Sequence, residues 1–279
     1  MPGRDETISR IARLRGVPVA ASLCGCLGVL PIPISAQTCE PTAAVLARVP
    51  PVPPPDLGPM PSEPLATAAL GVGHLHPDVE AALAGPPGDN GWVQRVALPL
   101  SGTPDGEPHT WIVRGWVVRA EGAPEPIALR GMLETGYEEV SFVVLERMDG
   151  WLHVRYASAA RDTEAAWVPE CALDASPARL TFSTWSDWLL GDGISPLFVR
   201  DNLPLTLHAE PSEASAGLAS VTEADVLVPH EIRGAWMRVT LAQPSGYCFP
   251  DVVSASREGW VRWLGEERGP RLWYFTRGC

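Results

Sequence analysis

An internal repeat in the second half of the chain constrains its fold more than any other feature. Val118–Tyr156 and Leu203–Leu241 align without a gap at an offset of 85 residues. Positions identical in both copies include Glu125/Glu210, Pro126/Pro211, Leu133/Leu218, Glu138/Glu223, Glu146/Glu231, Trp151/Trp236 and Val154/Val239. A further tryptophan phrase follows each copy, with Trp167 in the first and Trp260 in the second. A repeat of this size is one supersecondary unit used twice, which predicts two similar small domains.

Short stretches rich in Val, Ile and Trp recur from residue 92 onward, separated by Gly, Pro and Asp. The expected strands are Trp92–Leu100, Trp111–Arg119, Trp116–Ala120, Ile127–Leu133, Ser141–Glu146, Leu152–Tyr156 and Ala166–Val168, then Leu203–Leu207, Gly217–Ser220, Asp225–Val228, Trp236–Leu241 and Gly259–Trp263. Such spacing is typical of a small barrel or sandwich. No long segment of period 3.6 occurs in this region, which argues against an α/β fold. We therefore expect an all-β protein.

The chain is expected to comprise five segments. They are a signal peptide over 1–36, a Pro-rich disordered linker over 37–91, a first β domain with extra N-terminal strands over 92–175, a connector over 176–196 and a second β domain over 197–279. In the linker, Pro50–Pro55 predicts an extended polyproline II spacer and Pro77–Ala84 a short helix. His74 and His76 form a lone His-x-His pair, which is too sparse to predict a metal site.

The N-terminus has the features of an export signal. Four arginines within the first fifteen residues precede the apolar stretch Gly16–Ile34, and Ser35-Ala36 offers a small-residue cleavage point. Prolines interrupt the apolar stretch, so no lasting transmembrane span is expected. Leu23–Cys26 offers an alternative, because it resembles a lipoprotein box with Cys26 as the lipidated residue. A disordered apolar leader is the remaining interpretation.

The cysteine count agrees with export. Cleavage after residue 36 leaves Cys39, Cys171, Cys248 and Cys279, which predicts two disulfides with three possible connectivities. We favour Cys248–Cys279, since both lie in the second repeat and its tail, with Cys39–Cys171 pinning the N-terminal segment to the first repeat. None of these cysteines forms a Cys-x-x-Cys pair, so neither a zinc site nor a reactive dithiol is expected.

Composition and motifs narrow the possible functions. The formal net charge is −12 and every basic residue is arginine, with no basic run. Such a chain is a poor candidate for binding nucleic acid or anionic membranes. It contains no Gly-x-Ser-x-Gly, no His-Glu-x-x-His and no phosphate-binding loop. We therefore expect a protein that is not an enzyme and that uses no metal or cofactor.

The order of the repeat resembles the bacterial SH3 (SH3b) domain family. The matching phrases are Gly150–Val154 with Ala166–Val168 in the first copy, and Ala235–Val239 with Gly259–Val261 in the second. The resemblance covers about Val117–Leu173 and Pro204–Leu264. It implies two SH3-like barrels in tandem, with Trp151, Trp167, Trp236 and Trp260 in their cores.

The chain also departs from the pattern of that family. The opening Leu-Asn-Val-Arg phrase is missing, and the second copy carries an insertion over Ala242–Ser256. In the family the ligand is often a cell-wall peptide held by loops and edge strands. The resemblance transfers only the corresponding regions, Glu121–Pro126 and Ala209–Ala214, since no ligand-contacting motif matches residue by residue.

Aromatic residues outside the shared pattern are the candidate ligand contacts. These are Trp185, Trp188, Tyr247 and Trp263. Tryptophan supplies a large apolar surface on which peptides or sugars can stack. The alternative is that the apolar face around Trp185 and Trp188 packs on one or both barrels. The expected partner is cell-wall peptide or an envelope protein, so an adaptor role is the main alternative, and a wall hydrolase is a weaker one.

Overall fold

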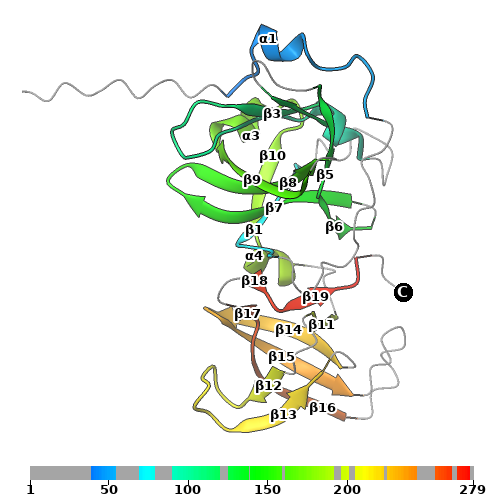
Figure 1. Ribbon diagram of the computed structural model, residues 1–279. Coiled ribbons are helices and arrows are strands. Elements are labelled where there is room, and N and C mark those ends of the chain that lie inside the picture. The colour runs from blue at the N-terminus through cyan, green and yellow to red at the C-terminus, as the bar shows by residue number, and fades with distance from the viewer. Residues whose placement is uncertain are drawn as a thin grey trace, which may run out of the picture. The chain divides into compact units, whose positions relative to one another are not determined.

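The computed structural model describes residues 39–54, 69–78, 90–119, 125–137, 139–158, 161–191, 196–200, 205–222, 225–243, 255–265 and 269–276. All of them belong to one compact unit, Ser35–Cys279. They are mostly β and form two large antiparallel sheets (Figure 1), which confirms the predicted all-β class. The predicted signal peptide with Cys26, the insertion around Tyr247, and the pair Cys248 and Cys279 lie outside the described residues.

The first sheet has ten strands. They are β1 Gly73–Pro77, β2 Ala97–Leu100, β3 Thr110–Val113, β4 Trp116–Arg119, β5 Ile127–Arg130, β6 Leu133–Gly136, β7 Glu139–Met148, β8 Trp151–Ser158, β9 Arg161–Pro169 and β10 Leu180–Thr184. Their order is β10-β1-β7-β8-β5-β4-β3-β2, with β6 beside β7 and β9 beside β8. Short helical segments accompany this sheet: α1 Ala43–Leu46, the 3-10 helix η1 Asn90–Arg95, and α3 Cys171–Ala175.

The second sheet has seven strands. They are β11 Leu197–Val199, β12 Leu205–His208, β13 Gly217–Val221, β14 Val226–Arg233, β15 Trp236–Gln243, β16 Ala255–Arg262 and β19 Leu272–Tyr274. Their order is β13-β12-β16-β15-β14-β11-β19. Strands β17 Leu264–Gly265 and β18 Gly269–Pro270 pair only with each other, and helix α4 Trp185–Leu189 follows β10 in the chain.

Strand pairing in the first sheet closes into a ring. From β8 the pairing runs through β5, β4 and β3 to β2. Ser101, which directly follows β2, then exchanges two backbone hydrogen bonds of 2.9 Å with Trp167 of β9. Since β9 also pairs with β8, these strands enclose a core that includes Leu98, Leu129 and Leu152.

The sequence repeat corresponds to equivalent strands in the two sheets. At the offset of 85 residues, β6 to β8 coincide with β13 to β15. Met148 pairs with Trp151 at the end of the first hairpin, and Arg233 pairs with Trp236 at the equivalent place in the second. A two-residue turn joins each pair of strands, with Gly150 at φ 84° and Gly234 at φ 57°. Tight hairpin turns need positive φ, which glycine adopts without steric cost.

Both hairpins carry a bulge at the same place. The register shifts between Val144 and Glu146 in β7, and between the equivalent Pro229 and Glu231 in β14. A bulge leaves one residue unpaired and bends the strand. Proline is tolerated in a strand at such a position. This explains why β14 continues through Pro229, although the sequence predicted a strand ending at Val228.

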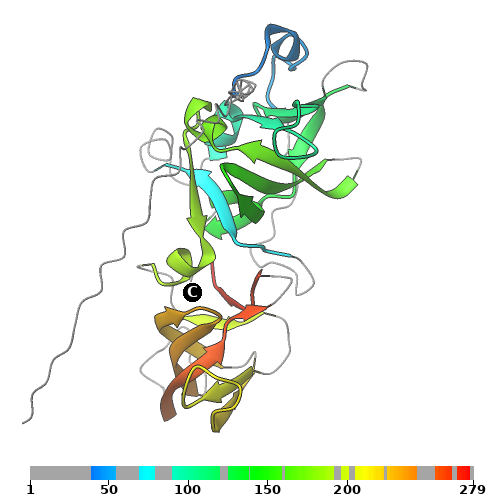
Figure 2. The same ribbon diagram turned by 90° about the vertical axis from the view of Figure 1, so that its left-hand side faces the viewer.

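The equivalence extends to the flanking strands. Leu75 of β1 faces Phe142 of β7, and Leu197 of β11 faces Leu227 of β14, which lies 85 residues after Phe142. The outer neighbour of β1 is β10, just as the outer neighbour of β11 is β19. Figure 2 shows β1, in cyan, running beside β10. Each copy therefore includes one strand before the sequence repeat and one after it.

This arrangement corrects two of the predicted segments. The disordered linker over 37–91 contains β1, which is paired on both sides, and the connector over 176–196 begins with β10. Pro77 ends β1, and the rest of the expected helix Pro77–Ala84 lies almost wholly outside the described residues. Residues 90–95 form η1 instead of a strand. Strand β1 is short, so its partners β7 and β10, which lie far away in the sequence, determine its conformation.

The four tryptophans expected in the barrel cores differ in burial. Trp151 is 4% exposed and Trp260 is 7% exposed, whereas Trp167 and Trp236 are half-buried. The outer face of Trp167 stacks on His153 with ring centroids 4.7 Å apart. Half-buried rings at these positions pack partly against polar neighbours on the sheet surface and not wholly within a core.

Candidate functional site

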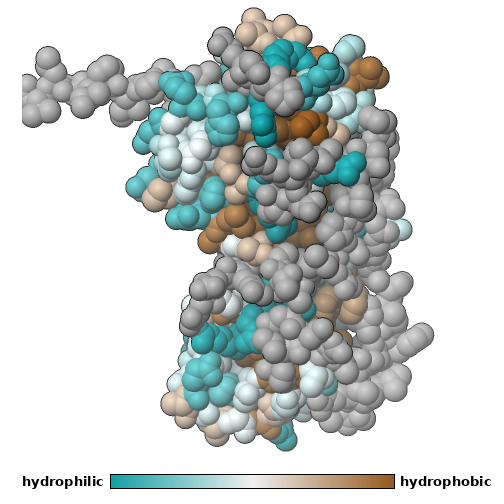
Figure 3. All heavy atoms as spheres, in the orientation of Figure 1, coloured by the Kyte–Doolittle hydropathy of each residue, from teal (hydrophilic) through white to brown (hydrophobic). Residues whose placement is uncertain are grey.

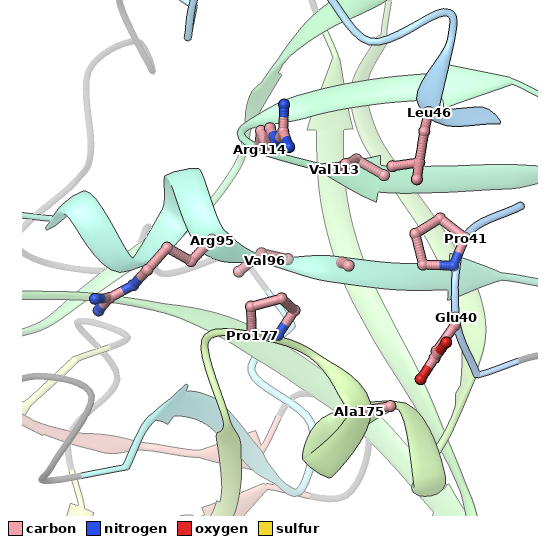
Figure 4. A pocket seen from close by; sticks show the side chains of 10 residues that line it. Glu40, Pro41, Leu46, Arg95, Val96, Val113, Arg114, Ala175 and Pro177 are labelled. Atoms are coloured by element: carbon pink, nitrogen blue, oxygen red, sulfur yellow. The ribbon is translucent and has the colours of Figure 1, made fainter. Parts of the chain in front are cut away.

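A cavity of about 360 Å³ lies on the first sheet, beneath the N-terminal segment 39–54, which we call the arm. Its lining comes from the arm, from η1 and β2, from the end of β3 with the turn that follows, and from the end of α3 with the segment that follows. The lining residues are Glu40, Pro41, Leu46, Arg95, Val96, Ala97, Val113, Arg114, Ala175 and Pro177 (Figure 4). This volume, hereafter the arm cavity, is large enough for a small ligand.

The arm is fixed to the sheet at several points. A disulfide joins Cys39 to Cys171 with the Cα atoms 6.0 Å apart, which confirms this predicted pair. Val45 of α1 is buried against the outer face of β3 and β4. Arg48 donates from Nη1 to the Arg119 carbonyl at 2.8 Å. The arm therefore forms a covalently anchored wall of the cavity.

The floor of the cavity is part of the sheet. Ala97 pairs with Val113 between β2 and β3, and both are buried, as is Val96. The backbone N–H of Arg114 donates to the Val96 carbonyl at 3.0 Å, which joins the end of η1 to the β3–β4 turn. The Ala97 N–H donates to Ser176 Oγ at 3.1 Å. The floor is thus apolar, and its edges are tied by hydrogen bonds.

Charged groups stand on two sides of this floor. Arg95 and Arg114 lie on one side and Glu40 on the other (Figure 4). Glu40 and Arg114 are exposed, whereas Arg95 is half-buried. The arrangement suits a ligand that is apolar in the middle and carries a negative group at one end and a positive group at the other. No motif in the sequence indicated this site, since its residues come from segments 40–46, 95–97, 113–114 and 175–177.

The four residues expected to contact a ligand are not brought together there. Trp185 and Trp263 are buried, at 1% and 3% exposed, and Trp188 is half-buried. The Trp263 indole N–H donates to the Gly234 carbonyl at 3.0 Å. Tyr247 lies outside the described residues. A buried ring has no free face for a ligand, so Trp185 and Trp263 act in packing in this structure.

Trp185 and Trp188 instead lie where the two sheets meet, as the alternative interpretation expected. Trp185 packs edge-on against Trp273 of β19, with centroids 5.2 Å apart, and its indole N–H donates to the Leu70 carbonyl at 2.7 Å. The Trp188 N–H donates to the Tyr274 hydroxyl at 2.6 Å. Figure 1 shows α4 beside β19 at this place. One hydrophobic core contains side chains from both sheets.

The histidine pair, His74 and His76, lies in the same region where the two sheets meet, which we call the junction. His74 is fully buried, stacks on Trp185 at 4.6 Å and meets Trp188 edge-on at 4.5 Å. Burial lowers the pKa of His74 well below its ordinary value, and the neighbouring His76 lowers it further. Burial also lowers the pKa of His76, partly offset by its contact with the Pro77 carbonyl. Burial raises the pKa of Tyr274. The junction therefore holds its titratable rings in their neutral forms.

Several other features bear on the choice of site. Among the described residues, no group of three or more His, Cys, Asp or Glu side chains is placed to hold a metal ion. No helix in the described part of the chain has the length and apolar character needed to cross a membrane. The region Ala209–Ala214 follows β12 as a surface turn, and most of Glu121–Pro126 lies outside the described residues. Figure 3 shows hydrophobic side chains on one face in small groups among hydrophilic ones.

Comparison with known proteins adds no further assignment. No protein-family model matches the chain, and no curated protein is significantly similar to it. The arm cavity is taken as the candidate site on the basis of its lining alone.

Proposed function

We propose that this chain is an exported, non-enzymatic binding protein that takes cell-wall peptide, or another peptide-like component of the envelope, into the arm cavity. The observation that carries the proposal is the lining of this cavity: an apolar floor between an arginine side and a glutamate side, under an arm held by a disulfide. The resemblance of the repeat to SH3b domains agrees with this role.

The disulfide supports the exported location. Structural disulfides form and persist in oxidising compartments and are rare in reducing ones. Cys39–Cys171 joins residues 132 positions apart and anchors the wall of the proposed site. A binding site that depends on such a bond would be poorly maintained in a reducing cytosol.

Peptides offer the chemistry that the cavity requires. A short peptide with small apolar side chains has a carboxylate at one end, an amine at the other and apolar surface between them. The floor residues Val96, Ala97 and Val113 can cover the apolar surface. The charged ends would face Arg114 and Glu40, where opposite charges give orientation and selectivity more than affinity.

Co-sedimentation with purified cell-wall sacculi tests the proposal. We expect the protein to pellet with sacculi and to be released by a digest of the same material. Leu46→Asp, which places a charge in the lining, should reduce retention. Val52→Asp, which alters an arm residue outside the lining, should not. Retention of no protein by sacculi would contradict the proposed ligand, and release of soluble wall fragments during long incubation would contradict the absence of enzymatic activity.

A further inference from the structure

The β3–β4 turn places Arg114 at an unusual backbone conformation beside the arm cavity. Val113 faces Trp116, so Arg114 and Gly115 form a two-residue hairpin turn, with φ values of 54° and 79°. Asn-Gly and Asp-Gly are favoured in such turns, because both central residues need positive φ. A long side chain is disfavoured there, and strain of this kind concentrates at functional sites.

No contact within the described residues accounts for the arginine at this position. The side chain of Arg114 is exposed and makes no hydrogen bond or ion pair with another described residue. Two other arginines of the first sheet are engaged: Arg147 pairs with Glu170 at 2.7 Å, and Arg155 donates to the Ala69 carbonyl at 2.6 Å. The strained position therefore presents a guanidinium at the rim of the cavity without a structural role in the described part of the fold.

The opposite rim and the floor define what this guanidinium could bind. Val113, adjacent in the chain, and Ala97 are buried floor residues, and Glu40 stands across the cavity from Arg114 (Figure 4). The chain as a whole has a net charge of −12, so an anion would be repelled except beside a local cation. A guanidinium is the side chain best suited to bind a carboxylate.

We propose that the arm cavity binds the free carboxyl end of a short peptide, with the terminal carboxylate on Arg114 and the last apolar side chains over the floor. This assignment rests on the proposed function and fixes the direction of the ligand. The peptide runs away from Arg114 toward Glu40, where a free amine of the ligand adds a second, more exposed contact.

Calorimetric titration with alanine tripeptide tests the direction. The probe is used in three forms, with both ends free, with the carboxyl end amidated, and with the amino end acetylated. We expect amidation to weaken binding about tenfold or more, since a charged hydrogen-bonded pair is lost. Acetylation should weaken it less. Equal binding of the amidated and free forms, or no binding of any form, overturns the proposal.

Arg114 can be replaced by a residue that tolerates the positive φ of the turn, so that a loss of binding is not caused by a loss of folding. Arg114→Asn removes the cation but fits the positive φ, so we expect unchanged or higher thermal stability together with a loss of binding similar to that of amidation. Arg130→Asn on β5 removes an exposed arginine outside the cavity lining and should leave binding unchanged. Normal binding by the Arg114→Asn variant overturns the proposal. If sacculi retain the protein while amidation has no effect, the carboxylate assignment alone fails; if sacculi do not retain it, the proposed function fails.

Discussion

The two copies of the repeat share a common set of strands but differ in what is inserted between them. In the second copy, β12 meets β16 through His208 and Trp260, and a surface turn leads directly to β13. In the first copy, Ser101 next to β2 forms an antiparallel backbone pair with Trp167, as His208 does with Trp260. Here, however, β3, β4 and β5 follow before β6 begins. The added strands close the ring and provide the outer face on which the arm packs.

This difference separates the structural part of the molecule from the proposed functional part. The shared hairpins, bulges and tryptophans occur in both copies and form the two sheets. The arm cavity depends on features of the first copy that the described residues of the second copy lack: the β3–β4 turn with Arg114, η1, and the arm with its disulfide. The repeated residues thus build the fold, and the residues of the proposed site lie where the first copy departs from the repeat.

Removing the Trp185 contact between the two sheets should have the largest effect on the free energy of unfolding. Trp185 is 1% exposed and packs on His74 and Trp273, so Trp185→Ala should lower the free energy of unfolding by about 3–5 kcal/mol. Because the ring contacts both sheets, we also expect one unfolding transition to divide into two. Urea unfolding followed by circular dichroism measures this, with exposed Met148→Ala as the control. A loss below about 1 kcal/mol would show that the sheets do not depend on this contact.

Much of the shared part of the fold could be predicted from the sequence. The repeat located the hairpins because glycine turns and tryptophans mark each strand pair, and β8 begins at Trp151 as β15 does at Trp236. Strands whose stability comes from distant partners could not be predicted in this way. β1 is a short segment in a Pro-rich region, and only pairing with β7 and β10 makes it a strand.

The candidate site was less accessible to sequence reasoning. The disulfide Cys39–Cys171, which anchors the arm beside the site, could be predicted because four cysteines allow only a few pairings. The lining itself depends on the side-by-side placement of η1, the β3–β4 turn and the arm, which no local pattern encodes. The local feature that could have drawn attention to one lining residue is Arg114-Gly115 between two apolar strands, because a turn of positive φ favours asparagine over arginine.

Removal of the disulfide should affect the first copy alone. Cys39→Ser with Cys171→Ser frees a chain segment spanning 132 positions, and the loss of this constraint should cost about 2–4 kcal/mol. The arm should then detach, because Val45 is its main buried contact. Protease cleavage in the arm and unfolding in the Trp185→Ala background measure the effect. A shift in the transition of the second sheet, or an arm that stays protected, would contradict the assignment of this bond to the first copy.

Matched tryptophan substitutions compare the two hairpins directly. Trp151 is 4% exposed whereas the equivalent Trp236 is half-buried, with an edge contact to His208 at 5.3 Å. Truncation to alanine should therefore cost about 2 kcal/mol more at Trp151 than at Trp236, because more apolar area is lost from the core. Chemical unfolding of both variants checks the difference. Equal losses would mean that the two hairpins bury this position to the same extent.

The smallest expected difference concerns pH. The position equivalent to His74 in the second copy is Pro196, so this buried ring is peculiar to the first copy. Because burial lowers the pKa of His74, the unfolded chain binds a proton below pH of about 6.5 while the folded chain still excludes it. Stability should be constant with respect to this group above that pH. It should fall on acidification by at most about 1.4 kcal/mol per pH unit.

His76 and His153 also make stability fall on acidification, since burial lowers the pKa of each. The contribution of His74 to the pH dependence of stability therefore has to be separated from theirs. His74→Phe keeps an aromatic ring against Trp185 but removes the titration. We therefore expect the variant to lose less stability than the parent between pH 6.5 and pH 5, whatever its stability at neutral pH. Urea midpoints measured across this range decide the point. Parallel pH profiles for parent and variant would show that the folded junction accepts a proton at His74 as readily as the unfolded chain does.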